Sequence, residues 1–313
     1  MCSPDQQRRE AAAAVAALRA GELVILPTET VYGLAADAAD PAAVARIYAA
    51  KGRPQFNPLI AHVADLAQAE RIAVFDERAR ALAAAFWPGP LTLVLPVRDR
   101  GAACELARAG LDTVAVRAPG HPLAQAVLRA FQGAVAAPSA NRSGRPSPTT
   151  FADAWAETGE AAAAGLDGGP CRVGLESTVV SILDAPRLLR PGAITRDAIE
   201  AVVGLLAEAE ADDGRRSPGR LTRHYAPNAP LRLGAAGPLP GEAYLAFGPY
   251  PPGDGVWNLS PTGDLAEAAA NLFSMLRAAD ASGPIGIAVA PAPEDGLGEA
   301  INDRLRRAAG HVG

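Results

Sequence analysis

Short apolar runs alternate with segments of helical spacing along the first two thirds of the chain. Six runs have the length of β-strands and are bounded by turn-forming residues: ELVILP, PLIAHV, LTLVLPV, TVAVRAP, AVAAPSA and STVVSIL. Helices are predicted over residues 5–20, 76–86, 121–131 and 150–157, and over DPAAVARIYAA, which begins with an N-cap aspartate and a proline. Strands interleaved with helices predict an α/β domain, and the varied connections fit a mixed sheet as well as a parallel one.

The pattern changes in the last third of the chain. The segment AEAEADDGRRSPGRLTRHYAPNAP is polar, contains proline and glycine, and is acidic first and then basic, which is typical of a linker. Beyond it, three strand-like runs (EAYLAF, GVWNL and PIGIAVA) and helical segments near 263–279 and 297–309 predict a smaller α/β domain. We therefore expect one domain over residues 1–205, a linker over 206–232 and a second domain over 233–313.

Composition narrows the function classes. Of 313 residues, 49% are hydrophobic and 20% are charged, which fits packed cores and argues against a disordered chain. The net charge of -5 and the 5% of aromatic residues argue against a general nucleic-acid-binding module. Cys2, Cys104 and Cys171 are widely spaced and form no zinc-binding pair. No signal region and no apolar run of roughly 18 residues is present, so we expect a cytoplasmic protein without a membrane partner.

Candidate chemistry lies in four loops that border short strands, where ligands bind in α/β sheets. The motifs GxxxxGK[ST], GxGxxG, HExxH and GxSxG are all missing from the chain. The first loop, PTETVYGL at residues 27–34, places two threonines around a glutamate. Taken alone, it also fits a turn in which Thr28 or Thr30 caps the backbone.

The second loop, KGRPQFNPL at residues 51–59, contains Lys51, the only lysine among 29 basic residues. A genome-wide preference for arginine explains why lysine is rare, but not why this one remains. Lys51 and Arg53 lie two residues apart in a stretch stiffened by two prolines. A fixed pair of cations suits a polyphosphate, because each offers several donors to anionic oxygens. His62 lies in the next strand, where a lone histidine is more often structural than catalytic.

The third and fourth loops are rich in polar groups. APSANRSGRPSPT, at residues 137–149, directly follows an apolar strand. It fits either a solvated, turn-rich loop or a nest of donors for phosphate. GLESTVVSI, at residues 174–182, carries no specific signal alone. The segment LLRPGAI follows it, and there a Pro-Gly pair stiffens the chain beside Arg190.

Together these segments resemble the threonylcarbamoyl-AMP synthase family, whose catalytic unit is a YrdC-type domain. The family pattern is a Lys-x-Arg pair followed much later by Ser-x-Asn, which here is Lys51, Arg53, Ser139 and Asn141. Seven stretches match in the same order over residues 10–205: PTETVYGL, KGRP..NPL, PGPLT, VAVRAP, APSANRSG.PSPT, ESTVV and LRPGAI. The tetrapeptide HYAP resembles the linker of the long, two-domain form, and the rest of the chain matches its C-terminal domain more weakly.

The resemblance implies a twisted mixed-sheet catalytic domain and a small Rossmann-like α/β C-terminal domain. It implies a nucleotidyltransferase that makes L-threonylcarbamoyladenylate from L-threonine, bicarbonate and ATP, releasing pyrophosphate, for the t6A modification of tRNA. Mg²⁺ would be bound mainly through the ATP phosphates, and we assign it no protein ligand. The product would pass to the t6A transferase machinery, and stable tRNA binding is not required.

Residue roles carried over from the family fall into two groups, with catalysis assigned to the Lys-x-Arg and Ser-x-Asn residues. L-threonine is expected to contact Thr30, His62, Arg117, Ala137 and Ser177. ATP is expected to contact Lys51, Arg53, Asn57, Thr113, Ser139, Asn141, Ser147, Arg190 and Tyr225. A compact ammonium and a planar guanidinium are not interchangeable at a crowded phosphate, which would explain the surviving lysine. Tyr225, in the predicted linker, would close over the site as a lid.

Three alternatives stay open at the level of sequence. Arginines lining a concave surface would suit an RNA-binding module, although the net charge argues against it. A carbamoyl-transferring maturation factor carries a related domain, but that class resembles fusions with zinc-binding cysteine pairs, which this chain lacks. Residues 233–313 show no catalytic constellation, so we expect them to form a structural or interaction domain.

Overall fold

The structure is a computed structural model that describes residues 4–54, 56–208 and 225–310. The elements of its N-terminal domain are α1 (Pro4–Arg19), β1 (Leu23–Leu26), β2 (Gly33–Asp37), α2 (Pro41–Lys51), β3 (Ile60–His62), α3 (Leu66–Ile72), α4 (Glu77–Phe86), β4 (Leu91–Pro96), β5 (Thr113–Arg117), α5 (Pro122–Phe131), β6 (Val135–Ala136), α6 (Phe151–Thr158), the 3-10 helix η1 (Gly159–Ala161), β7 (Ala162–Gly165), β8 (Thr178–Ile182), β9 (Pro186–Arg190) and α7 (Arg196–Val203). Those of its C-terminal domain are β10 (Leu231–Arg232), β11 (Glu242–Ala246), β12 (Val256–Asn258), α9 (Leu265–Ala281), β13 (Gly286–Val289) and α10 (Leu297–Ala308).

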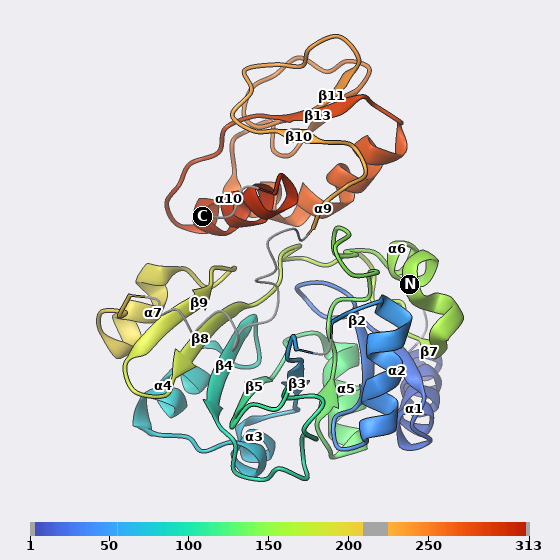
Figure 1. The fold of residues 1–313 in the computed structure, drawn as a ribbon, viewed down its shortest axis with the longest axis vertical. Coiled ribbons are helices and arrows are strands. Elements are labelled where there is room, and N and C mark those ends of the chain that lie inside the picture. The colour runs from blue at the N-terminus through green and yellow to red at the C-terminus, as the bar shows by residue number, and fades with distance from the viewer. Residues whose placement is uncertain (1–3, 55, 209–224, 311–313) are drawn as a thin grey trace.

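The N-terminal domain is built on a nine-stranded mixed sheet in the order β7-β1-β2-β6-β3-β5-β4-β8-β9 (Figure 1). The pairs β1–β7, β3–β5 and β4–β8 are parallel, and the other neighbours are antiparallel. The prediction of an α/β domain with a mixed sheet is confirmed. Strands β2, β7 and β9 and helices α3 and α7 were not predicted. The sequences of β2 and β7, GLAAD and AAAG, are poor in residues that favour strands, and the pairing of these two segments with β1 decides their conformation.

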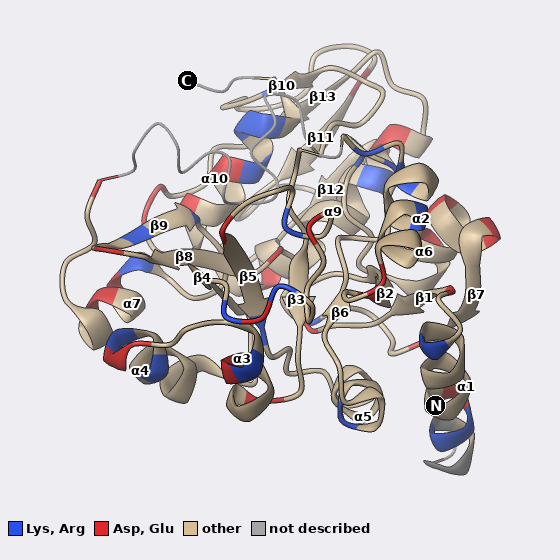
Figure 2. Cartoon of the chain, turned by 60° about the horizontal axis from the view of Figure 1, so that its bottom comes forward, with Lys and Arg blue, Asp and Glu red and all other residues tan. Residues whose placement is uncertain are grey.

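Alternation along the strands separates the two faces of this sheet. Leu23 and Ile25 of β1 pack in one cluster with residues of α2, α3, α4 and α7. Val24 and Leu26, on the opposite face, pack against α1 and α5. On their outer sides α3 and α4 carry basic and acidic residues interleaved, as solvated helices do (Figure 2). Among the described residues, no helix is long and apolar enough to cross a membrane.

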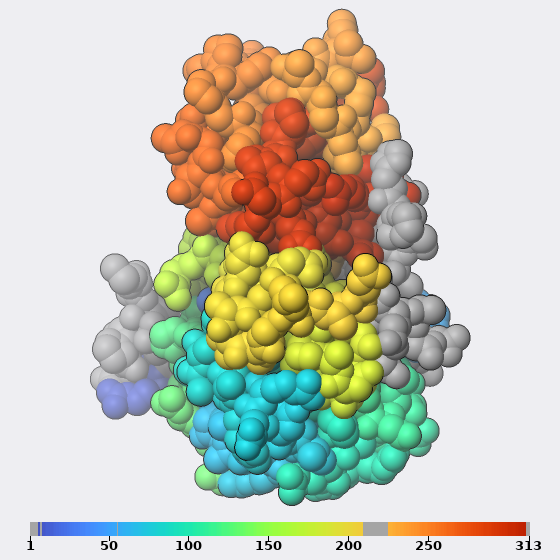
Figure 3. All heavy atoms as spheres, turned by 90° about the vertical axis from the view of Figure 1, so that its left-hand side faces the viewer, coloured from blue at the N-terminus to red at the C-terminus, as the bar shows by residue number. Residues whose placement is uncertain are grey.

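The C-terminal domain has a parallel sheet in the order β10-β13-β11-β12. Three strands were predicted, and the fourth, the two-residue β10, is defined by its pairing with β13. Helices α9 and α10 lie between this sheet and the N-terminal domain (Figure 1), and the two domains meet without a visible gap (Figure 3). Val31 and Leu175 of the N-terminal domain belong to the same buried apolar cluster as Leu272 and Phe273 of α9. The boundaries at 205 and 232 stay a prediction, since residues 209–224 lie outside the described residues.

Candidate active site

Strand register brings candidate side chains to one face of the nine-stranded sheet, because paired residues share a face. His62 pairs with Arg117 between β3 and β5, and Arg190 pairs with Val179 between β8 and β9. With the neighbouring loops they line one pocket. The predicted site residues that line it are Thr30, Arg53, His62, Arg117, Ala137, Ser139, Ser177, Arg190 and Tyr225.

A buried carboxylate holds Arg117 in this pocket. The Arg117 guanidinium donates from Nη2 to Oε1 of Glu29 (2.6 Å) and from Nη1 to Oγ1 of Thr30 (2.9 Å). Its Nε donates to the carbonyl oxygen of Gly89 (3.2 Å). Burial raises the pKa of Glu29, but the charge and hydrogen bond of Arg117 outweigh it, so the pKa lies below its ordinary value. Arginine has five N–H donors, and these contacts leave two of them for a ligand carboxylate.

His62 is a neutral imidazole. Burial and the charge of Arg117 lower the pKa of His62 to about 3. Its Nδ1 lies 3.1 Å from the carbonyl oxygen of Ile60, and the ring makes a second hydrogen bond to the backbone of Val135. A neutral imidazole has one N–H donor and keeps one nitrogen lone pair as an acceptor. His62 can therefore accept a hydrogen bond from a hydroxyl or an amine, but it is too weak a base to hold a proton near neutral pH.

The turn after α2 separates Lys51 from Arg53. Helix α2 begins after its predicted N-cap, Asp40, and ends at Lys51. Gly52 then adopts the left-handed conformation (φ 58°) as the C-cap, which glycine does without strain. Arg53 leaves this turn to line the pocket, whereas Lys51 does not line it.

Lys51 lies behind the pocket wall, where its Nζ donates to the carbonyl oxygens of Ser139 and Asn141. Two of its three donors are used in this way. Burial and the charge of Arg53 lower the pKa of Lys51 well below its ordinary value. The same burial lowers the pKa of Arg53 to about 10. The two cations of the Lys-x-Arg pair thus occupy one buried region.

The segment of residues 137–149, called here the Ser139 loop, runs beside the start of β2. The N–H of Leu34 donates to the carbonyl of Pro138 (2.8 Å), and Gly33 forms an isolated bridge with Ser139. A Cβ on Gly33 would lie 3.2 Å from the Cβ of Ala137, which is tighter than an ordinary contact. Glycine at this position therefore permits the close approach that places the Ser139 loop at the pocket.

Three polar atoms of predicted site residues are buried without a hydrogen bond to the described part of the chain: Nε of Arg53, Nδ2 of Asn57 and Oδ1 of Asn141. Leaving such a group unsatisfied costs about 1–3 kcal/mol. Two of the three atoms are donors, as a phosphate requires. Asn57 is itself buried, and its carbonyl accepts from the hydroxyl of Tyr48 (3.0 Å).

Arg304 of the C-terminal domain supports this pocket from behind its wall, by pairing with Glu176. This side chain is 0% exposed and donates from Nε to Oε2 of Glu176 (2.8 Å). Ser147 donates to the other carboxylate oxygen of Glu176, which lines the pocket. Burial raises the pKa of Glu176, but the charges of Arg304 and Arg190 outweigh it and lower that pKa.

Tyr225 lies within the predicted linker and is the first described residue after positions 209–224. Its backbone is left-handed (φ 64°), and its ring is 1% exposed. The ring lies 5.4 Å from that of Phe273, and the guanidinium carbon of Arg304 lies 5.5 Å from its centroid. Burial and the charge of Glu176 raise the pKa of Tyr225 to about 12. Tyr225 thus joins the pocket to the C-terminal domain.

The structure places Thr113 apart from the other predicted site residues. It begins β5, four residues before Arg117, and so lies about 13 Å along the strand from that arginine. It does not line the pocket. Conversely, the sequence analysis did not single out Glu29, Glu176 or Arg304. The two glutamates lie within the quoted loops PTETVYGL and GLESTVVSI, whereas no local signal marks Arg304.

Comparison with known proteins covers both domains. The Sua5, YciO and YrdC family model, described as telomere recombination, matches residues 16–192. A second model, described as the C-terminal domain of threonylcarbamoyl-AMP synthase, matches residues 194–310. Threonylcarbamoyl-AMP synthase of Bacillus subtilis (strain 168) is 41% identical over 322 residues, which cover 96% of this chain and 92% of the relative. That of Pyrococcus abyssi is 40% identical over 319 residues, 94% of this chain and 92% of the relative.

The crystal structure of P. abyssi Sua5 complexed with L-threonine is similar over almost the whole chain. The TM-score is 0.88 at 39% identity, covering 99% of this chain and 96% of that one. The match includes the twisted mixed sheet and the second α/β domain, so the predicted fold class is confirmed. The chain therefore belongs to the threonylcarbamoyl-AMP synthase family, whose members make threonylcarbamoyl-AMP from L-threonine, bicarbonate and ATP for the t6A modification of tRNA.

Proposed function

We propose that this pocket carries out the family reaction as a nucleotidyl transfer, with L-threonine and ATP bound side by side. The observation that carries the proposal is that one pocket has two sets of buried residues, each with at least one arginine. Arg117 lies with His62 and Glu29, while Arg53 lies near Arg190. Two anionic substrates have to meet, so a site with two such sets supplies the charge and the positioning that the reaction needs.

L-threonine would lie beside β3 and β5. The two remaining donors of Arg117 would bind its carboxylate in a bidentate pair. The imidazole of His62 and the hydroxyl groups of Thr30 and Ser177 would hold its hydroxyl and amine, with the backbone of Ala137 nearby. Hydrogen bonds already fix the positions of these two hydroxyls: Thr30 accepts from Arg117, and Ser177 bonds to Thr92 (2.7 Å). This fixed position supports their placement around the ligand.

ATP would lie beside the Ser139 loop. Arg53, Asn57 and Lys51 would supply donors to its phosphates, since two of them hold buried donors without partners and Lys51 keeps one. The remaining residues proposed around the nucleotide are Ser139, Asn141, Ser147, Arg190 and Tyr225. Thr113 remains a prediction from the family resemblance, which its position in β5 does not support.

Mg²⁺ is proposed to bind mainly through the ATP phosphates and water. The described residues contain no group of three His, Cys, Asp or Glu side chains that could hold a metal ion. The two carboxylates at the pocket, Glu29 and Glu176, are each paired with an arginine. This donor set fits an ion that arrives with its nucleotide. When bound, Mg²⁺ would neutralise part of the phosphate charge.

The proposed chemistry has two steps. The threonine amine attacks the bicarbonate carbon, and loss of water leaves a carbamate anion. A carbamate oxygen then attacks the α-phosphorus, the bond to the β-phosphate oxygen breaks, and pyrophosphate leaves. We assign no side chain as general base, because a histidine with a pKa of about 3 is unsuited to that task near neutral pH. The product would pass to the t6A transferase machinery without stable tRNA binding, and a cytoplasmic location remains a prediction.

The test is pyrophosphate release by the full chain with ATP and Mg²⁺, omitting threonine or bicarbonate in turn. We expect release only when both are present, together with a nucleotide product of the mass of threonylcarbamoyl-AMP. Arg117→Ala should raise the KM for threonine at least tenfold and change the KM for ATP little. Release that ignores threonine would overturn the proposed reaction. Tight, salt-dependent RNA binding would instead favour the RNA-binding alternative.

A further inference from the structure

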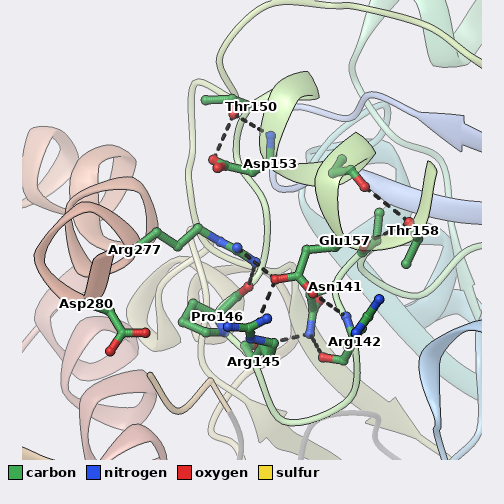
Figure 4. Close-up of polar contacts among 12 residues, drawn as sticks. Asn141, Arg142, Arg145, Pro146, Thr150, Asp153, Glu157, Thr158, Arg277 and Asp280 are labelled. Atoms are coloured by element: carbon green, nitrogen blue, oxygen red, sulfur yellow. Dashed lines mark hydrogen bonds and ion pairs between the residues drawn. The ribbon is translucent and has the colours of Figure 1, made fainter. Parts of the chain in front are cut away.

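Glu157, near the end of α6, is a buried carboxylate outside the pocket that joins three segments of the chain (Figure 4). Its side chain is 5% exposed. Oε2 accepts the backbone N–H of Arg142 (3.0 Å), in the Ser139 loop. Oε1 accepts from Nη1 of Arg277 (2.9 Å), in α9 of the C-terminal domain. One carboxylate thus ties the Ser139 loop to the C-terminal domain.

Arg277 also contacts the Ser139 loop directly. Its Nη2 donates to the carbonyl oxygen of Pro146, so a single guanidinium bridges Glu157 and the far end of the loop. Figure 4 shows Arg277 extending from α9 toward both partners. Arg145 lies nearby, with its Nε 3.7 Å from Glu157, but its side chain is 45% exposed. Arg277 is therefore the better buried of the two arginines that pair with Glu157, at 17% exposure.

The anchored loop carries the residues proposed to act on ATP. Arg142 directly follows Asn141, whose Nδ2 donates to the carbonyls of Arg142 (2.8 Å) and Arg145 (2.9 Å) and so closes the loop from within. The ammonium of Lys51 is held by carbonyls of the same loop, and the N–H of Ser143 donates to the Lys51 carbonyl (2.7 Å). A shift of the loop would therefore move Asn141 and Lys51 together.

We propose that Arg277 is a positioning residue for ATP that acts through Glu157 and Pro146 on the Ser139 loop. Neither Arg277 nor Glu157 lines the pocket, so neither is expected to touch substrate. Without Arg277, the buried Glu157 carboxylate would lose its closest cationic partner, and breaking such a pair is strongly unfavourable unless the surroundings rearrange. The loop is the element free to rearrange, since it has no regular secondary structure between β6 and α6. The inference rests on the proposed function, because it assigns the loop to the ATP side.

The first test is steady-state kinetics of Arg277→Met and Glu157→Gln. We expect the KM for ATP to rise about tenfold in each, because a displacement of about 1 Å can cost up to a hundredfold. The KM for threonine should stay within twofold, since Arg117 and His62 lie outside the loop. Ala137, at the start of the loop, is held separately by its N–H, which donates to the carbonyl of Ile60 in β3 (3.2 Å). The double variant should be little worse than either single variant, because both remove the same link. Arg277→Lys should recover only part of the loss, because one ammonium cannot reproduce the two-pronged contact.

The matched control is Arg196→Met. Arg196, in α7, pairs with Glu299 of α10 (2.9 Å) and so also links the two domains, but it does not touch the Ser139 loop. We expect its kinetics to match those of the unmodified chain. Equal rises of the two KM values in Arg277→Met, an unchanged KM for ATP, or the same ATP defect in Arg196→Met would each overturn the proposal.

The second test does not depend on activity. Hydrogen exchange at the amides of Arg142 and Ser143 should quicken in Arg277→Met and Glu157→Gln but not in Arg196→Met. Unchanged exchange in the first two would overturn the positioning role. If exchange quickens while the unmodified chain releases no threonine-dependent pyrophosphate, the anchor exists and the proposed function fails, so the two failures are distinguishable.

Discussion

The two domains differ in where their buried charged residues lie. In the N-terminal domain, His62, Arg117 and Arg190 project from strands into a pocket on one face of a mixed sheet. In the described part of the C-terminal domain, the buried charged residues are Arg304 and Arg307, both on α10 rather than at the strands. Arg304 forms an ion pair with Glu176, which lies at the wall of the other domain's pocket. Of these two buried arginines, one therefore pairs with the pocket wall of the other domain, and the other pairs with Asp303 of its own helix.

Among the variants that test this difference between the domains, Arg304→Met should have the largest effect. Removing one partner of a buried ion pair leaves an uncompensated charge and costs about 3–5 kcal/mol, so we expect a loss of that order in the free energy of unfolding. Denaturant titration would measure it. Arg306→Met, on the same helix, breaks an exposed pair with Glu294 and should cost at most about 1 kcal/mol. Equal losses in the two variants would show that Arg304 does not anchor the pocket wall.

Lys51→Ala tests the N-terminal side of the comparison. The proposed function gives the third Nζ donor of Lys51 to the ATP phosphates. Loss of such a donor lowers turnover by about 10²–10³-fold, so we expect a drop of that size in kcat/KM for ATP. The KM for threonine should change little. Lys51→Arg is the informative control, because it keeps the charge but replaces a compact ammonium with a planar fork. Full activity in Lys51→Arg would contradict the explanation given for the single lysine of this chain.

Tyr225 sits where the two domains meet, and its truncation should have a smaller effect. Tyr225→Ala removes a ring that contacts Phe273 and Arg304, each contact being worth about 1 kcal/mol. We expect turnover to fall about tenfold, without unfolding, in the pyrophosphate assay. Tyr225→Phe keeps the ring and should retain most of the activity. Unchanged kinetics in Tyr225→Ala would remove the proposed lid role.

The last prediction concerns the pH dependence of stability at His62. Its pKa falls from 6.5 to about 3 on folding, so below pH 6.5 the unfolded chain binds a proton that the folded chain does not. Stability from this group is therefore complete above pH 6.5 and falls as the pH drops, by up to about 1.4 kcal/mol per pH unit. Unfolding of His62→Asn at pH 5 and pH 7 should show a shallower dependence. His121→Asn is a useful comparison, because burial lowers the pKa of His121 as well. An identical slope in the unmodified chain and His62→Asn would contradict the burial of a neutral imidazole.

The sequence by itself determined the features that depend on neighbours along the chain. Helix α2 starts beside its N-cap, Asp40, and the glycine of the Lys-x-Arg pair forms the turn that separates the two cations. Apolar runs located the central strands, and the ordered motifs identified the family. All of these are local, because a cap, a turn or an alternating strand needs only a few successive residues.

Only the tertiary structure decided which distant residues meet. Strand register brings His62, Arg117 and Arg190 to one face, and it leaves Thr113 at the opposite end of β5. The anchors Arg277 and Arg304 lie more than a hundred residues from their partners Glu157 and Glu176. An arginine on an amphipathic helix is compatible with solvent or with a buried carboxylate. Only the packing of α9 and α10 against the N-terminal domain selects the second, because burial makes an unpaired carboxylate too costly to leave alone.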